Sequence, residues 1–312
     1  MQKVLGEAER ENPVELEASS TARGPHSMLS ACVDTAFGRP RNFLNNRFAY
    51  AVISQRVHGL SIGVNLIPDK QCNFDCFYCE VNRSEIPRDR EIDVKVMSTE
   101  LQDLLSLVHE NKLREVAWFR HLPAELLQLK AVALSGDGEP TLCPKFGEVV
   151  REVVHIRSQA KFPFFKIVLI TNTAGLSLPE ARVGLHLLTT QDEVWVKLDA
   201  GTQDYMNQVN RPDISLRKVL ANILLIGRER PVVIQSLFPL IAGEEPPPGE
   251  IEQYVQRLQE LKTGGAQIAM VQIYSAHRPP QRGDLCDHLP LKSLSYIARR
   301  VREVTGLKAE VF

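Results

Sequence analysis

The chain has 312 residues, enough for one large α/β domain or two average domains with a full core and no disulfides. Hydrophobic residues make up 44% and charged residues 24%, and 37 basic side chains nearly balance 38 acidic ones. The formal net charge of -1 argues against a protein held to nucleic acid mainly by its overall charge, and leaves room only for a local basic patch.

The N-terminal stretch MQKVLGEAERENPVELEASS contains no apolar run typical of a secretion signal. No segment of the chain approaches the roughly 18 apolar residues of a membrane span. We therefore expect a cytoplasmic protein without a membrane anchor. Because thiols stay reduced in that compartment, clustered cysteines indicate metal binding or catalysis before disulfides.

Residues 1–45 are rich in Glu, Ser, Ala, Gly, Pro and Arg and show little periodicity. We expect them to form a poorly ordered N-terminal extension, followed by a core domain at 46–312. Within the core, segments dense in β-branched residues predict strands at 60–67, 131–136, 164–172, 193–200, 232–238 and 267–274.

Amphipathic helices are predicted between the strands. One carries Leu101, Leu104, Leu105 and Val108 behind a capping box of Thr99 and Gln102. A second carries Ile251, Val255, Leu258 and Leu261, and a third runs from Leu291 to Val304. Since parallel neighbours need a crossover connection, strands that alternate with helices predict an α/β fold with a parallel sheet.

Polar side chains collect where the predicted strands end. They are the cysteine loop 72–79, Gly136 to Glu139, Thr171 with Asn172, Asp199, Gln235 with Ser236, and Gln272 with Tyr274. Because the carboxyl ends of parallel strands share one edge of a sheet, we expect these groups to converge there.

Three of the six cysteines, Cys72, Cys76 and Cys79, lie close together in DKQCNFDCFYCEVNR. A structural zinc site uses four ligands, commonly as paired C-x2-C knuckles. Here Cys143, Cys286 or a distant histidine would have to complete one. Ordinary 4Fe-4S clusters have a thiolate on each iron, so three cysteines leave one iron open to an exogenous ligand.

The spacing C-x3-C-x-φ-C, with Tyr78 at the aromatic position, resembles the signature of radical S-adenosylmethionine (SAM) enzymes. The resemblance implies a partial, open (β/α)6 barrel and a 4Fe-4S cluster on Cys72, Cys76 and Cys79. It also implies that SAM binds the open iron. The reduced cluster then cleaves SAM to methionine and a 5′-deoxyadenosyl radical, which abstracts hydrogen from a substrate.

The segment SGDGEPTL at 135–142 resembles the Gly-Gly-Glu segment of the same superfamily. By this resemblance the SAM amino group is bound by Gly136, Asp137, Gly138 and Glu139. The glycines allow close backbone approach, and a carboxylate accepts from an ammonium group. The resemblance further assigns Asn172 and Asp199 to the carboxylate and ribose of SAM, and Tyr78 to its adenine.

Several stretches of the sequence indicate which branch of the superfamily the chain resembles. They are GVNLIPDKQCNFDCFYCEVNR, LSGDGEPTL, LITN, VKLDAGTQDYMNQVNRP and VQIYSAHRPP. Together they resemble the wyosine-synthase-type branch, which includes enzymes that build the tricyclic base of tRNA, over about residues 50–312. The tRNA-modifying members carry a second cluster on three further upstream cysteines, whereas only Cys32 precedes Cys72 here.

We therefore expect the fold and SAM chemistry of that branch without its tRNA substrate. A small molecule or peptide is favoured as substrate, and flavodoxin or ferredoxin as the reducing partner. Two alternatives stay open: a wyosine-type tRNA-modifying enzyme, and a non-catalytic zinc- or cluster-binding regulatory module.

Other single residues have a functional and a structural interpretation. Cys32, Cys143 and Cys286 are interpreted as ordinary small packing residues. Lys197, Arg211 and Arg278 are candidate contacts for an anionic substrate. The alternative for Lys197 is a structural ion pair, and the alternative for the two arginines is a solvated position in a loop. His277 is a candidate proton donor or a structural histidine.

Overall fold

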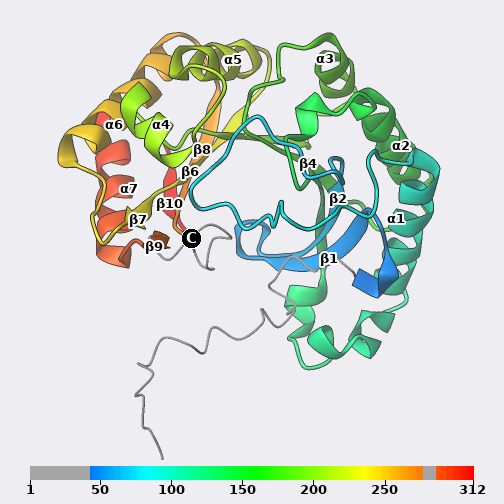
Figure 1. Ribbon diagram of the computed structural model, residues 1–312. Coiled ribbons are helices and arrows are strands. Elements are labelled where there is room, and N and C mark those ends of the chain that lie inside the picture. Colours follow the sequence, from blue (N-terminus) through cyan, green and yellow to red (C-terminus); the bar gives the residue numbers. More distant parts are fainter. Residues whose placement is uncertain (1–42, 277–285) are drawn as a thin grey trace, which may run out of the picture. The chain divides into compact units, whose positions relative to one another are not determined.

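The computed structural model describes residues 43–276 and 286–312. Within these ranges an eight-stranded sheet has the order β1-β2-β3-β4-β5-β6-β8-β10 (Figure 1). Its strands are β1 (Ala49–Ser54), β2 (Gly59–Asn65), β3 (Leu129–Ser135), β4 (Lys166–Thr171), β5 (Glu193–Lys197), β6 (Val232–Leu237), β8 (Ile268–Tyr274) and β10 (Ala309–Val311). Only β1 is antiparallel to its neighbour in this sheet, and the parallel α/β architecture predicted from the sequence is confirmed.

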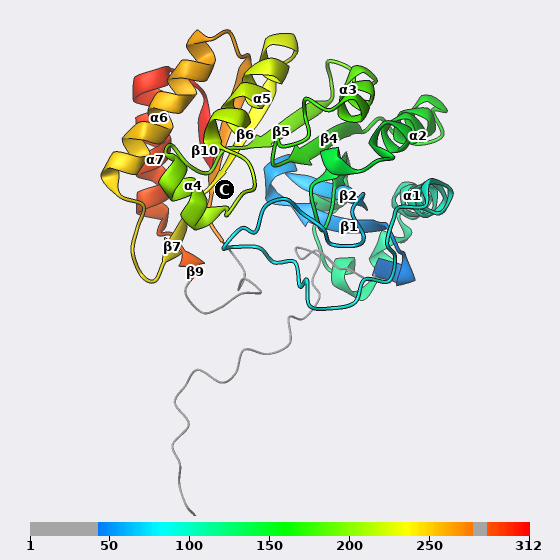
Figure 2. The same cartoon turned by 45° about the horizontal axis from the view of Figure 1, so that its top comes forward.

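The helices lie along the outer side of the curved sheet (Figures 1 and 2). They are α1 (Val94–His109), α2 (Phe146–Ser158), α3 (Pro179–His186), α4 (Gln203–Val209), α5 (Leu216–Glu229), α6 (Pro248–Thr263) and α7 (Leu291–Thr305). Among the described residues, none of the helices has the length and apolar character needed to cross a membrane. A small second sheet pairs β7 (Pro239–Ile241) with β9 (Cys286–His288).

The start of α1 corrects one prediction. Asp93 caps this helix by accepting from the backbone N–H groups of Lys95 and Val96, so the helix begins before the predicted capping box. Thr99 lies inside the helix and its hydroxyl donates to the Lys95 carbonyl at 3.1 Å. The prediction was wrong because Met97 extends the buried stripe by a further turn upstream.

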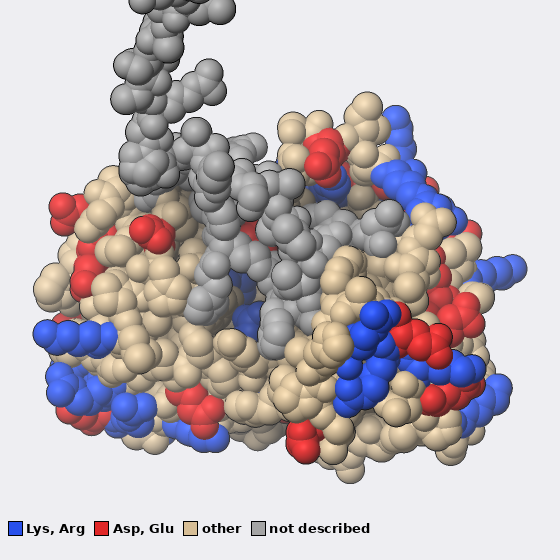
Figure 3. Space-filling model, turned by 90° about the horizontal axis from the view of Figure 1, so that it is seen from below, with Lys and Arg blue, Asp and Glu red and all other residues tan. Residues whose placement is uncertain are grey.

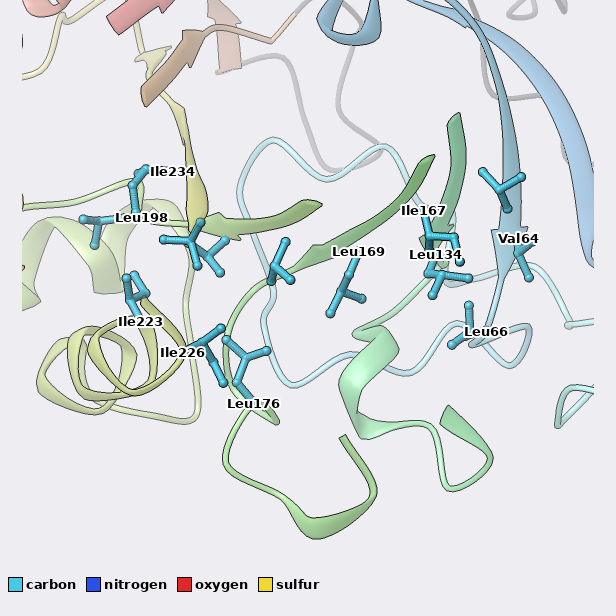
Figure 4. Packing of buried hydrophobic residues seen from close by; sticks show 14 of the residues in the cluster. Val64, Leu66, Leu134, Ile167, Leu169, Leu176, Leu198, Ile223, Ile226 and Ile234 are labelled. Atoms are coloured by element: carbon cyan, nitrogen blue, oxygen red, sulfur yellow. The ribbon is translucent and has the colours of Figure 1, made fainter. Parts of the chain in front are cut away.

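Two apolar clusters hold the sheet. On its outer side, Leu198 and Ile234 lie near Ile223 and Ile226 of α5 (Figure 4). On its inner side, a smaller cluster joins Val57, Ala131, Val168, Trp195 and Val233. The strands are therefore buried on both faces, which explains their nearly continuous apolar composition.

The two edges of the sheet, β1 and β10, approach each other without pairing. The rings of His58 and Phe312 lie 6.1 Å apart, and a cavity of about 650 Å³ lies between the edges. The sheet is thus a barrel left open on one side. Phe43, near the end of the predicted extension, is 1% exposed and packs against Phe119. Residues 1–42 of that extension lie outside the described residues, so its boundary stays a prediction.

Candidate functional site

The cysteine loop follows β2 and crosses the end of the sheet (Figure 2, cyan). Its backbone is fixed to the segment after α4: the Phe77 N–H donates to the Val209 carbonyl at 2.7 Å, and the Asp75 N–H to the Asn210 carbonyl at 3.1 Å. These contacts join segments about 130 residues apart and hold the loop over the carboxyl ends of the strands.

The three thiols of this loop are free and half-buried. Asn210 Nδ2 lies 3.6 Å from Cys76 Sγ, and Asn172 Nδ2 lies 3.8 Å from Cys72 Sγ. The Cys79 N–H donates to the Cys76 carbonyl at 3.0 Å, which closes a turn between these two cysteines. Burial raises the pKa of the Cys72 thiol and raises that of Cys76 to about 12, so binding a metal has to displace their protons.

The donor set, three free thiols on one loop, is compatible with an iron-sulfur cluster. Among residues 43–276 and 286–312, no three His, Cys, Asp or Glu side chains are gathered closely enough to hold one ion. In a 4Fe-4S cluster each thiolate binds a different iron, so the sulfurs need not converge on one point. The Phe74 N–H, 3.4 Å from Cys72 Sγ, adds a backbone donor of the kind that tunes such clusters.

The segment Gly136 to Glu139 packs directly against the start of the cysteine loop. A Cβ atom on Gly138 would lie 1.7 Å from the Gln71 carbonyl oxygen, so no side chain fits there. Asp137 accepts from Asn65 Nδ2 at 2.9 Å, and its own N–H donates to Asn65 Oδ1 at 3.0 Å. The ends of β2 and β3 are thereby fixed to each other and to the loop.

Glu139 is 2% exposed and joins the ends of β3 and β4. Its Oε1 accepts from the N–H and hydroxyl of Thr141 and from the hydroxyl of Thr171, and its Oε2 accepts from the Asn172 N–H at 2.6 Å. Burial raises the pKa of Glu139, although these hydrogen bonds oppose the rise. A carboxylate oxygen has two lone pairs, so Oε2 retains room for one further donor.

Asp199 is the centre of a second buried network. Its Oδ2 accepts from the Tyr78 hydroxyl and from Asn210 Nδ2 at 2.8 Å. Its Oδ1 accepts from the Leu237 N–H at 2.8 Å and lies 3.3 Å from Lys197 Nζ. Burial and the Asp199 charge raise the pKa of Tyr78 well above its usual value, so Tyr78 remains a donor.

Lys197 belongs to this network, because its ammonium group is paired with Asp199. Its Nζ also lies 3.1 Å from the Tyr274 hydroxyl. Burial alone would lower the pKa of Lys197, but the attraction of Asp199 and Tyr274 raises it above the usual value. Lys197 was predicted to be either a contact for an anionic substrate or part of a structural ion pair, and these contacts are those of a structural ion pair.

A cavity of about 550 Å³ extends from the cysteine loop along the inner face of the sheet. Tyr78 and Cys79 line it, so the network around Asp199 reaches its wall. Its other lining residues include Tyr50, Ser61, Ala133, Ser135, Val168, Ile170, Trp195 and Tyr274. A cavity of this volume is typical of small-molecule sites.

The remaining predicted contacts lie elsewhere. Arg211 is 45% exposed at its side chain and lies 3.9 Å from Asp75, away from the residues that line the cavity. Cys143 is buried, Cys286 lies on β9, and Cys32, His277 and Arg278 are outside the described residues.

The expected convergence of all strand ends holds only in part. Gln235 and Gln272 are each 1% exposed and bond to each other, and Ser236 donates to the Leu198 carbonyl. None of these three lines the cavity of about 550 Å³. They lie within β6 and β8, before the strands end, where their side chains are enclosed. Conversely, Asn210, which directly follows α4, was missed, because its contacts with Cys76 and Tyr78 join segments far apart in the sequence.

The open barrel with the cysteine loop across its end is the fold that the sequence predicted, and the solved structures that share this fold include TYW1. The chain is 16% identical to TYW1 in its structure with a lysine-pyruvate adduct bound, over 84% of this chain and 86% of that chain, with a TM-score of 0.56. At this identity the likeness shows the shared fold alone.

Curated proteins also match parts of the chain. The chain is 27% identical to a UPF0026 protein of Synechocystis over 58% of its length, and the match spans 59% of that relative. It is 23% identical to a UPF0026 protein of Helicobacter pylori over 82% of its length and 80% of the relative. No family model matches the sequence.

Proposed function

We propose that this protein is a radical SAM enzyme that binds one 4Fe-4S cluster through Cys72, Cys76 and Cys79. The observation that carries the proposal is the setting of the thiols, which are free, share one loop and lie against the amides of Asn172 and Asn210. When bound, the reduced cluster supplies the electron that cleaves SAM to methionine and a 5′-deoxyadenosyl radical, which abstracts hydrogen from the substrate.

SAM is proposed to bind where the two buried carboxylate networks face the cysteine loop. The proposed contacts are Tyr78, Gly136, Asp137, Gly138, Glu139, Asn172 and Asp199. Glu139 offers its Oε2 to an ammonium group, and Gly138 keeps the backbone against the loop. Because Asp199 has four partners of its own, its part is to orient Tyr78 and Asn210 unless a ribose hydroxyl replaces one of them.

The favoured substrate is a small molecule or a peptide segment inside the cavity of about 550 Å³, with flavodoxin or ferredoxin as the electron donor. On the described part of the face drawn in Figure 3, basic and acidic side chains are interspersed. The net charge of -1 agrees with this preference, since tRNA binding depends on many phosphate contacts. The likeness to TYW1 keeps a tRNA-modifying role as the second candidate.

Metal content tests the proposal. Anaerobic reconstitution with iron and sulfide should give about four irons per chain. Cys72→Ala, Cys76→Ala and Cys79→Ala should each lose them, whereas Cys143→Ala and Cys286→Ala should retain them. Zinc bound in place of iron would favour the regulatory module, and saturable sub-micromolar binding of bulk tRNA in a gel shift at physiological salt would favour the tRNA-modifying role.

A further inference from the structure

The inner cavity holds an arginine that the sequence motifs do not single out. Arg56 lies in a short 3-10 helix, η2 (Gln55–Val57), between β1 and β2, and it lines the cavity of about 550 Å³. Its guanidinium carbon lies 4.7 Å from the ring centroid of Tyr274 and 5.8 Å from that of Trp195. Both aromatic rings also line the cavity.

The N–H donors of the Arg56 guanidinium have no acceptor among the described residues. Across the described ranges 43–276 and 286–312, no hydrogen bond or ion pair engages its guanidinium group. The faces of the two rings stabilise the positive charge of the guanidinium group but accept none of its five N–H groups in conventional hydrogen bonds. The planar arrangement of these N–H groups matches the geometry of a planar oxyanion such as a carboxylate. A half-buried arginine in this state is suited to bind an anionic ligand.

The neighbouring cation is already neutralised. Lys197 Nζ lies 3.3 Å from Asp199 and 5.4 Å from the centroid of the same Tyr274 ring. Arg56 and Lys197 therefore contact the same ring, and Tyr274 links Arg56 to the network that includes Tyr78. An anion held by Arg56 would lie beside an aromatic ring that also contacts the network proposed to face SAM.

We propose that Arg56 binds a carboxylate of the substrate, and that the substrate is a monoanionic organic acid with an apolar body. The identification of the bound acid as the substrate rests on the proposed function, whereas the binding of a carboxylate by Arg56 does not depend on it. The single charge of Arg56 matches a carboxylate, whereas a phosphate monoester carries about -1.5 to -2 near neutral pH. Ala133, Val168 and Ile170 supply the apolar wall for the body of the acid.

The test measures binding of simple probes to protein reconstituted with iron and sulfide. Trp118→Phe leaves Trp195, which lines the cavity, as the one remaining tryptophan of the two in the sequence. Its fluorescence is titrated with hexanoate, hexyl phosphate, hexanol and hexylamine at constant ionic strength. The titrations are repeated with Arg56→Met, with Arg56→Lys, and with the exposed control Arg299→Met, and circular dichroism checks the fold of each variant.

Hexanoate should bind more tightly than the other three probes. Arg56→Met should weaken it roughly ten-fold or more, Arg56→Lys should weaken it less, and Arg299→Met should leave it unchanged. No saturable binding of hexanoate, equal binding by folded Arg56→Met, or tighter binding of hexyl phosphate would overturn the proposal. Iron content and SAM cleavage, measured on the same wild-type preparation, test the proposed function separately, because probe binding requires neither.

Discussion

Gly138 and Gln71 are in such close contact that the glycine cannot be replaced without moving the cysteine loop. A Cβ atom at Gly138 would lie 1.7 Å from the Gln71 carbonyl oxygen, and a backbone atom cannot rotate away. Gln71 directly precedes Cys72, so the end of β3 sets the position of the first thiol.

Gly138→Ala should therefore reduce cluster assembly. We expect reconstituted protein with this substitution to contain less than half the iron of the wild type, because the backbone at Gln71, next to Cys72, has to shift. Gly249→Ala is the matched control, since no atom lies within 4 Å of the Cβ it would add. Iron content equal to that of the wild type in Gly138→Ala would show that the loop adapts without cost.

Asn210→Leu should weaken both the fold and the cluster. Asn210 is 2% exposed, and its side-chain amide donates to Asp199 and approaches Cys76 Sγ. Its loss therefore removes one donor from each of these two buried groups. We expect a loss of roughly 1–3 kcal/mol in the free energy of unfolding, measured with denaturant, and faster loss of iron on anaerobic desalting. The exposed Asn207→Leu on the same helix should change neither quantity.

Glu139→Ala should destabilise the fold as well as weaken SAM binding, because Thr141, Thr171 and the Asn172 N–H all lose an acceptor. A stability loss of about 1.5–3 kcal/mol is expected. Thr171→Val removes one donor and leaves the carboxylate, so it separates the two effects: it should lower stability while SAM affinity, measured by equilibrium dialysis, stays near wild type. If Glu139→Ala binds SAM like the wild type, Glu139 has no part in the SAM site.

The buried ion pair of Asp192 and Arg157 predicts how stability depends on pH. Burial alone would raise the pKa of Asp192, but hydrogen bonds from Arg157 and from two backbone N–H groups lower it. A carboxyl with a lower pKa in the folded state adds stability that is full above about pH 5 and is lost as the pH falls through that lowered pKa.

Asp192→Asn should accordingly lose roughly 3–5 kcal/mol at pH 7 and less at pH 3, as measured by urea unfolding at both values. Glu252→Gln is the control, because Glu252 also pairs with an arginine, Arg300, but at the surface. It should cost less than about 1 kcal/mol at either pH. An equal loss of unfolding free energy in Asp192→Asn at pH 3 and pH 7 would contradict the lowered pKa of Asp192 in the folded state.

The sequence allowed the six central strands to be predicted because they are buried on both faces and consist largely of β-branched residues. The edge strands β1 and β10 were missed for a different reason: β10 has three residues, and an antiparallel strand before β2 depends on tertiary pairing. The cysteine motif and the segment after β3 were visible as local patterns. Asn210 and Arg56 were not, since their significance comes from neighbours far along the chain.

The most direct test of the central claim is the product that the reduced, reconstituted wild-type protein makes from SAM under anaerobic conditions. Liquid chromatography with mass spectrometry should detect 5′-deoxyadenosine and methionine in equal amounts, with neither product from Cys76→Ala. Formation of S-adenosylhomocysteine or 5′-methylthioadenosine as the main product, or unchanged SAM in a preparation that carries about four irons, would contradict the account.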